Sequence, residues 1–247
     1  MRVYKLEECG RSYIGHWFTM MLASLKDVDL SEKIQLCFDL DYTNEPYQKE
    51  SLDILSDVIE VVPKTSNATF IPGNKIQTGS QEEYQSYIFL RELFLSRMQN
   101  DFDTSEYDKI YIRRNKSHLC EGNIFAKSER KRQIVNEDEL VEKLSEKGIR
   151  ALNFEDYSVS QKIQIFNNAS LVIAPNGGGL VFSLFAGLQT KIVELNPQQS
   201  RSDNSHYEFI SKGLKTDFNA YRRCQNIDAK DNMKIDVEDF IDYLETI

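Results

Sequence analysis

A glycine-rich turn between two apolar runs is the feature that most constrains this chain. Residues 170–175 are a short apolar run ending in proline, residues 176–179 read Asn-Gly-Gly-Gly, and apolar residues then recur at helical spacing. This pattern predicts a buried strand, a tight turn and the N-terminus of a helix. Backbone N–H groups at a helix N-terminus lack intrahelical partners, and glycines let an anion approach them. The turn either binds phosphate or only connects the strand to the helix. A single glycine-rich turn is too weak a signal to decide between these two interpretations.

Apolar runs and helical patterns alternate on both sides of this turn. In the second half, strands are predicted at residues 109–112, 149–154, 170–175 and 191–195, and helices at 136–147, 158–169, 178–187 and 236–244. In the first half, strands are predicted at 3–6, 33–38, 58–62 and 68–71, and helices from residue 13, at 47–55 and from residue 81 to about 98. Such alternation is typical of an α/β fold with parallel, doubly wound sheets. The acidic stretch 100–108 contains few large apolar residues, so we predict two α/β domains, 1–104 and 105–247.

Composition and charge narrow the possible partners and the compartment. The formal net charge of −9 argues against general nucleic-acid binding, which needs many Lys and Arg contacts to phosphate. Residues 109–132 are nevertheless basic, which favours a small anionic ligand, although a solvated loop explains residues 127–132 equally well. No apolar run is long enough to cross a bilayer and no signal peptide is evident, so we expect a cytoplasmic protein, with peripheral membrane association left open. The four cysteines show neither metal-binding spacing nor a redox pair, and we expect reduced thiols.

Polar side chains gather at the predicted C-terminal ends of the strands, where ligands bind in doubly wound sheets. They are Arg113, Arg114, Glu155, Asn176 with Gly177, Gly178 and Gly179, and Glu194. An arginine fork and a helix end would hold a diphosphate, and a carboxylate could accept hydrogen bonds from ribose hydroxyls. An NAD-dependent dehydrogenase or a methyltransferase is a competing interpretation. Those proteins carry the glycine turn after the first strand of the sheet, whereas here it comes late.

Five blocks in order resemble glycosyltransferase family 61. They are Arg113-Arg114, residues 132–140 (RQIVNEDEL), residues 154–158 (FEDYS) with Gln161, residues 169–180 (ASLVIAPNGGGL) and residues 193–197 (VELNP). Gly15-His16-Trp17 also resembles an amino-terminal motif of that family. The resemblance implies a GT-B fold, in which two Rossmann-like domains face each other and the donor site lies in the C-terminal domain. It also implies inverting transfer from a nucleotide sugar, usually UDP-linked, to a glycan or polysaccharide acceptor without an obligatory metal or other cofactor.

The resemblance further assigns donor-binding residues. Arg113 with the neighbouring Arg114 and the turn at Gly177, Gly178 and Gly179 would hold the diphosphate. Glu194 would lie near the ribose, and Tyr157 and Ser158 near the base.

One departure from the family concerns Asn176, which stands where the family usually has His. Asn can donate a hydrogen bond but cannot carry a proton or a positive charge. A nucleotide-sugar-binding protein with impaired catalysis is therefore the alternative to an active enzyme.

Other residues are the candidates for the catalytic base and for metal ligands. His16, at a helix start in the first domain, is the expected catalytic base, although a His beside Trp17 on an apolar helix also fits a buried structural role. Asp39 and Asp41 invite a metal interpretation, but one helix-capping turn explains both, and no metal site is expected.

Overall fold

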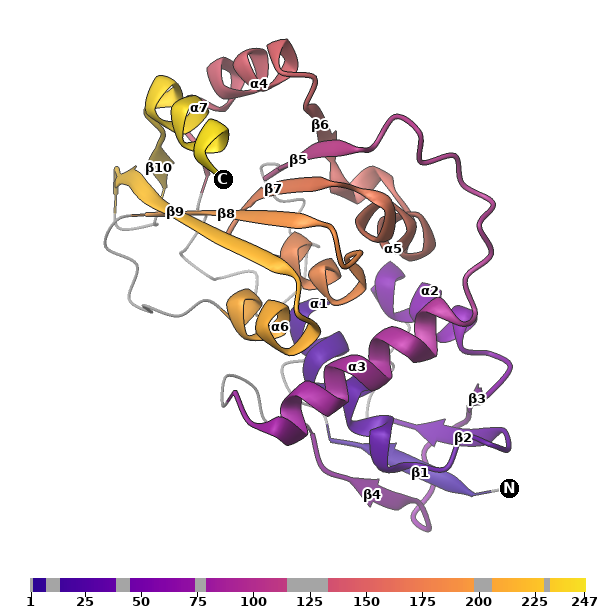
Figure 1. Cartoon of the computed structure of the whole chain (residues 1–247). Coiled ribbons are helices and arrows are strands. Elements are labelled where there is room, and N and C mark those ends of the chain that lie inside the picture. The colour runs from indigo at the N-terminus through magenta and orange to yellow at the C-terminus, as the bar shows by residue number, and fades with distance from the viewer. Residues whose placement is uncertain are drawn as a thin grey trace.

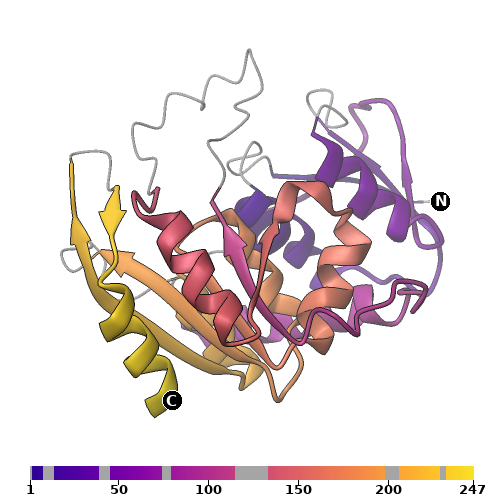
Figure 2. The ribbon, with the colours of Figure 1, turned by 90° about the horizontal axis from the view of Figure 1, so that it is seen from above.

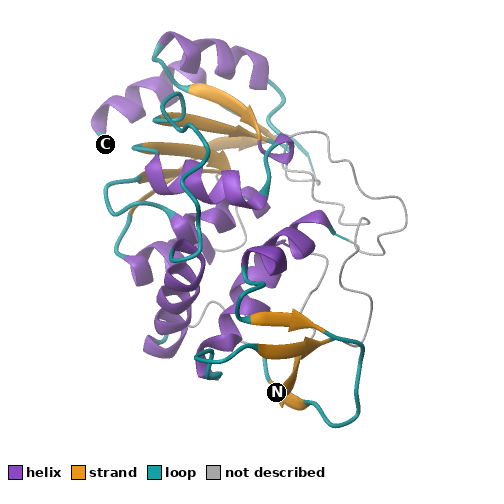
Figure 3. Ribbon diagram, turned by 90° about the vertical axis from the view of Figure 1, so that its right-hand side faces the viewer, coloured by secondary structure: helices purple, strands orange, loops and turns teal. Residues whose placement is uncertain are grey.

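The computed structural model describes residues 2–7, 14–38, 45–73, 79–114, 133–197, 206–228 and 232–247. Its elements form two sheets with helices between and around them (Figure 1, Figure 3). The amino-terminal unit comprises the four-stranded sheet and helices α1 to α3, and the carboxy-terminal unit comprises the six-stranded sheet and helices α4 to α7. The two parallel-rich sheets confirm the predicted α/β class. The boundary at residue 104 stays a prediction.

The amino-terminal sheet has the order β3-β2-β1-β4, and all its neighbouring strands are parallel. Its strands are β1 (Val3–Leu6), β2 (Ile34–Cys37), β3 (Ile59–Val61) and β4 (Thr69–Ile71). Helices α2 (Pro46–Ile54) and α3 (Gln81–Leu95) accompany it, and the Ser80 side chain caps α3 as its sequence predicts. Each of these elements was expected from the sequence.

The carboxy-terminal sheet has the order β10-β9-β8-β7-β5-β6 and is parallel except for β10. Its strands are β5 (Lys109–Arg113), β6 (Arg150–Asn153), β7 (Leu171–Pro175), β8 (Lys191–Pro197), β9 (Asp217–Asn226) and β10 (Met233–Lys234). Its helices are α4 (Glu137–Glu146), α5 (Val159–Asn168), α6 (His206–Leu214) and α7 (Val237–Thr246). The sequence patterns did not predict α6, β9 or β10.

Helices cover both faces of this sheet, as Figure 2 shows from above. Helices α4 and α7 bury Leu140, Leu144 and Phe240 against Tyr111 and Val193 on one face. On the other face lie α5, α6 and the 3-10 helix η5 (Gly178–Phe185), within a larger apolar cluster. The apolar runs of β5 and β7 are continuous because strands covered on both faces have no solvent side.

The larger cluster also holds the first helical segment of the amino-terminal unit. That segment consists of α1 (Ile14–His16), the π-helix η1 (Trp17–Met21) and the 3-10 helix η2 (Leu22–Asp27), rather than one regular α-helix. Phe18 is fully buried, with ring centroids 5.7 Å from Phe94 and 5.6 and 5.9 Å from Phe182 and Phe185 of η5. One hydrophobic core therefore joins the two units, which fixes the cleft between them.

The described helices include none with the length and apolar content needed to cross a membrane. Cys37 and Cys224 are buried free thiols, and Cys9 and Cys120 lie outside the described residues.

Candidate functional site

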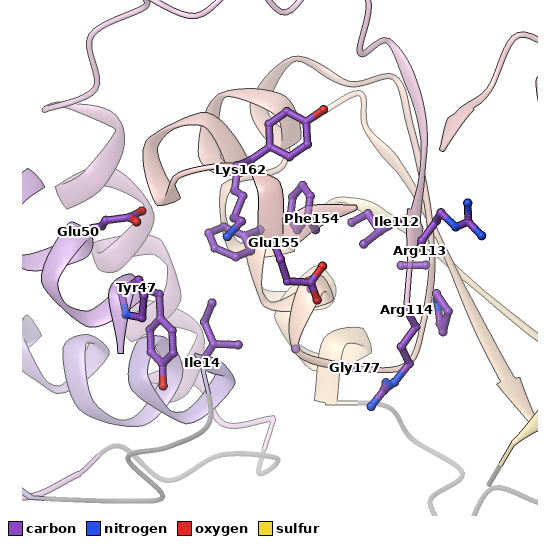
Figure 4. A pocket seen from close by; sticks show the side chains of 17 residues that line it. Ile14, Tyr47, Glu50, Ile112, Arg113, Arg114, Phe154, Glu155, Lys162 and Gly177 are labelled. Carbon is purple, nitrogen blue, oxygen red and sulfur yellow. The ribbon is translucent and has the colours of Figure 1, made fainter. Parts of the chain in front are cut away.

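A cavity of about 460 Å³ lies between the two units, at the C-terminal ends of β5, β6 and β7 (Figure 4). The amino-terminal unit supplies one wall, and the strand ends, the glycine turn and α5 supply the other. The lining residues are Ile14, Pro46, Tyr47, Glu50, Ile112, Arg113, Arg114, Phe154, Glu155, Tyr157, Lys162, Ala174, Pro175, Gly177, Gly178, Gly179 and Phe182. Small-molecule sites commonly have this size and this position in a doubly wound sheet.

The two arginines at the end of β5 lie in different surroundings. Side chains alternate along a strand, so Arg113 shares the α4 face with Tyr111, while Arg114 follows Ile112 toward the cavity. Arg113 Nη2 lies 2.9 Å from Asp138 Oδ1, and its Nε lies 3.4 Å from Glu137 Oε2. In Figure 4 the Arg113 guanidinium points away from Glu155, although the residue still contributes to the cavity wall. Arg114 is therefore the better placed of the two to contact a ligand.

The glycine turn and Arg114 fit closely together. Arg114 Nη1 donates a hydrogen bond to the Asn176 carbonyl oxygen at 2.5 Å. A Cβ atom on Gly177 would lie 2.3 Å from that same nitrogen, and one on Gly178 would lie 2.8 Å from Ile14 Cγ2. Glycine at these two positions thus lets Arg114 approach the turn from one unit and Ile14 from the other.

The helix after the turn differs from the expected one. Residues 178–185 form the 3-10 helix η5, where an α-helix to Gly187 was predicted. The last turn of η5 is held from the amino-terminal unit, because Arg91 of α3 donates hydrogen bonds to the carbonyl oxygens of Leu184 and Ala186.

Asn176 and Glu194 form a buried pair behind the turn. Glu194 is completely buried, and its two carboxylate oxygens accept hydrogen bonds from the side-chain amides of Asn176 and Asn196, both at 2.6 Å. Neither Asn176 nor Glu194 lines the cavity. The pair is placed to fix the turn, because a buried carboxylate is costly unless its oxygens accept hydrogen bonds.

The carboxylate that the carboxy-terminal unit contributes to the cavity is that of Glu155, which follows β6 in the short 3-10 helix η4 (Phe154–Asp156). Because β6 neighbours β5, the end of β6 brings Glu155 to the same cavity edge as Arg114. In Figure 4 the Glu155 carboxylate points into the space between Arg114 and Lys162.

Tyr157 and Ser158, the two residues predicted near the base, have different surroundings. Tyr157 lines the cavity, and burial together with a hydrogen bond to the Tyr107 hydroxyl raises its pKa to about 12. Ser158 does not line it. Its hydroxyl accepts the Gln161 N–H at 3.2 Å, and its own N–H donates to Gln161 Oε1 at 2.9 Å, which is a capping box for α5.

His16 does not line the cavity, although its near neighbour Ile14 does. Residues two apart on a helix point to nearly opposite sides, so the two side chains diverge. His16 is half-buried, and burial lowers its pKa. It interacts electrostatically with His206 of α6.

Sequence reasoning missed two charged residues of the cavity, Glu50 on α2 and Lys162 on α5. Glu50 Oε2 accepts the backbone N–H of Val159 at 2.5 Å, so a carboxylate of one unit caps a helix of the other. The sequence does contain a hint of Lys162, because this residue lies early in a predicted helix, where the helix macrodipole disfavours a cation. It contains no such hint of Glu50, because nothing in the sequence around Glu50 indicates what its side chain faces.

Within the described ranges, no three His, Cys, Asp or Glu side chains gather as a metal site would require. Asp39 and Asp41 lie outside those ranges.

Comparison with known proteins identifies a family for this chain. The model of the family Glycosyltransferase 61 matches residues 14–193, which is more than half of the chain. No curated protein matches the sequence. Among solved structures, the chain is similar to the E. coli heptosyltransferase WaaC, solved with ADP-2-deoxy-2-fluoro heptose. That match has a TM-score of 0.45 and 9% identity and covers 100% of this chain and 99% of the other.

Proposed function

The chain belongs to the glycosyltransferase 61 family, and we propose that it transfers a sugar from a UDP-linked donor to a glycan or polysaccharide acceptor with inversion. The donor would lie in the cavity between the units, held mainly by the carboxy-terminal unit in a GT-B arrangement. One observation carries this proposal: Arg114 and the glycine turn line the same cavity, and the other unit supplies the facing wall.

Arg114 and the turn at Gly177, Gly178 and Gly179 hold the diphosphate in this proposal. A guanidinium and backbone N–H groups stabilise the charge that develops on a departing diphosphate. Tyr157 contacts the base, and Glu155, rather than the buried Glu194, accepts hydrogen bonds from the donor. Arg113, Ser158, Asn176 and Glu194 support the site from behind.

Inverting transfer also needs a general base on the acceptor side. Of the two candidates from the amino-terminal unit, Glu50 lines the cavity and His16 does not, so we assign the base to Glu50. Its hydrogen bond from Val159 orients the carboxylate.

The Glu50→Gln variant tests this assignment. It loses the basic carboxylate but keeps an oxygen that accepts the Val159 N–H, so it should lose most of its turnover while its UDP affinity changes less than about threefold. His16→Ala should leave turnover nearly unchanged. The opposite pattern would return the base to His16.

The test of the proposed function is a UDP titration followed by turnover with a panel of UDP-sugars and glycan acceptors. Binding and EDTA-resistant transfer are the expected results. UDP binding without hydrolysis or transfer would instead favour a catalytically impaired binding protein. The structure gives a specific reason for this alternative, because the Asn176 side-chain amide already donates a hydrogen bond to Glu194. Thermal stabilisation by NAD and none by UDP would favour a dehydrogenase.

A further inference from the structure

The wall that the amino-terminal unit gives to the cavity carries one aromatic side chain among the described residues, that of Tyr47. This wall consists of Ile14, Pro46, Tyr47 and Glu50. Tyr47 is half-buried, and both it and Ile14 pack against the apolar core that joins the two units, which holds the ring in place. In Figure 4 the Tyr47 ring lies on the same side of the cavity as Ile14, and Arg114 lies on the opposite side. The ring is therefore a fixed aromatic surface on the wall opposite Arg114.

The other aromatic residues of the cavity are less suited to hold a second ligand. Phe154 and Phe182 are 5% and 1% exposed, so they offer a ligand almost no ring surface. Tyr157 belongs to the carboxy-terminal wall, where the proposed function gives it the base of the donor. An aromatic ring buries the apolar C–H face of a sugar and leaves the hydroxyl groups at the edge of the sugar available for hydrogen bonds. Tyr47 is thus the ring that a pyranose on the amino-terminal wall would contact.

Tyr47 and Glu50 lie three residues apart on α2, so their side chains leave the same face of the helix, and both line the cavity. The Cβ atoms of such a pair are about 5 to 6 Å apart, which is similar to the width of a pyranose ring. A pyranose stacked on Tyr47 can therefore bring a hydroxyl group at its edge to the Glu50 carboxylate. The Val159 N–H of the carboxy-terminal unit holds that carboxylate in position.

Inverting transfer also requires the acceptor to lie on this side of the donor. The acceptor oxygen must approach the anomeric carbon from the side opposite the departing diphosphate, and the proposed diphosphate site lies at Arg114 and the glycine turn. In this step the acceptor hydroxyl passes its proton to Glu50 and its oxygen forms the new bond to the anomeric carbon. The old bond breaks, and its electron pair leaves on the diphosphate. The acceptor is then placed against the amino-terminal wall, where Tyr47 lies.

We propose that Tyr47 is the platform of the acceptor subsite and that the acceptor is a pyranoside stacked on its ring, with the reacting hydroxyl at Glu50. This inference rests on the proposed function, and it names the chemical form of the acceptor that the function leaves open.

The test uses saturation-transfer NMR on the protein with UDP bound. The probes are the methyl pyranosides of glucose, galactose, mannose and xylose, and the open-chain polyol glucitol is the comparison because it has hydroxyl groups but no ring face. At least one methyl pyranoside should bind, and glucitol should not. When the aromatic protons of the protein are irradiated, the protons on one face of the bound pyranose should receive more saturation than those on the other.

Variants of Tyr47 separate the platform from a structural role. Tyr47→Leu keeps an apolar side chain but removes the ring, so it should weaken pyranoside binding by about fivefold to tenfold while UDP affinity changes less than about twofold. Tyr47→Phe keeps the ring and should retain binding to within about twofold of wild type. Tyr243→Leu removes a partly buried tyrosine of α7 that does not line the cavity, so it is the matched control and should leave every affinity unchanged.

Binding of none of the pyranosides to a protein that binds UDP, equal binding of glucitol, or uniform saturation of the pyranose protons would overturn the platform and leave the proposed donor site intact. Unchanged pyranoside binding in a folded Tyr47→Leu protein would remove Tyr47 from the subsite. A loss of UDP-sugar affinity alone in that variant would assign the ring to the donor instead. Absence of UDP binding in wild type would overturn the proposed function together with this inference.

Discussion

Arg113 and Arg114 are adjacent in sequence, yet the end of β5 directs them to opposite faces of the sheet. The sequence identifies an arginine pair at a strand end but does not say which member reaches the ligand. Every residue from Ile110 to Ile112 is buried, so no polar alternation marks the cavity face. The Glu137 and Asp138 carboxylates that hold Arg113 belong to α4, and their contact is visible only in three dimensions.

Arg114→Ala should weaken UDP binding by about 2 kcal/mol, the scale for losing a hydrogen bond to a charged group. Arg113→Ala should change it by less than about 0.5 kcal/mol, because that guanidinium is paired outside the cavity. Calorimetric titration of both folded variants with UDP measures the difference. A larger loss in Arg113→Ala than in Arg114→Ala would reverse the assignment.

His206 makes stability depend on pH. Its ring is packed beside Tyr87, and burial lowers its pKa to about 4, with a smaller opposing effect of Glu83 and a smaller lowering effect of His16. In the unfolded chain His206 takes up a proton near pH 6.5, whereas in the folded chain it does so only near pH 4. The free energy of unfolding should therefore fall, by at most about 3 kcal/mol, as the pH drops through this window.

Urea unfolding of wild type and His206→Gln at pH 7 and pH 5 checks this expectation. The variant cannot bind the proton, so its stability should fall less than that of wild type between the two values. Parallel losses in the two proteins would show that His206 does not cause the dependence.

Most of the regular strands and helices were predicted from the sequence, whereas α6, β9 and β10 were not. The helix beginning at residue 14 is a π-helix and a 3-10 helix for most of its length. Its side chains pack against both units, and that packing overrides local preference. Strand β9 was not predicted because most of its residues are polar and at least partly exposed. Only Tyr221 and Cys224 of this strand are buried, so it lacks the apolar pattern of a strand. Glu194 was expected at a strand end but lies in the middle of β8, and its pairing with two side-chain amides is a tertiary feature.

Ser158 tests whether a residue near the cavity binds the donor or only stabilises an element. The capping box predicts that Ser158→Ala lowers the free energy of unfolding by about 1 kcal/mol. Ser158→Asp retains a cap and should cost less. UDP affinity should stay within about twofold in both, as measured by calorimetry beside urea unfolding. A selective loss of UDP affinity in a stable Ser158→Ala protein would return Ser158 to the donor site.

At the scale of the whole molecule, the two units share one apolar core although each has its own sheet. Phe18 joins them through its contacts with Phe94 and with two phenylalanines of η5. Sequence patterns indicate two α/β units but carry no information on how much surface they share. The shared core keeps the cavity walls in register, because both walls are attached to it.

Phe18→Ala should lower the free energy of unfolding by about 3 to 4 kcal/mol, the cost of removing a buried aromatic ring. Wild type should unfold in one transition, because the core is continuous. Fluorescence of Trp17, the single tryptophan, reports the amino-terminal unit, and far-ultraviolet circular dichroism reports both. Two separated transitions in wild type would show that the units are stabilised independently.

A crystal structure of the protein with UDP bound shows directly whether Arg114 and the glycine turn hold the diphosphate. The diphosphate should lie between the Arg114 guanidinium and the backbone N–H groups of residues 177–179, with the uracil toward Tyr157. UDP bound away from this cavity, or held there by Arg113 with Arg114 turned away from the phosphates, would contradict the account.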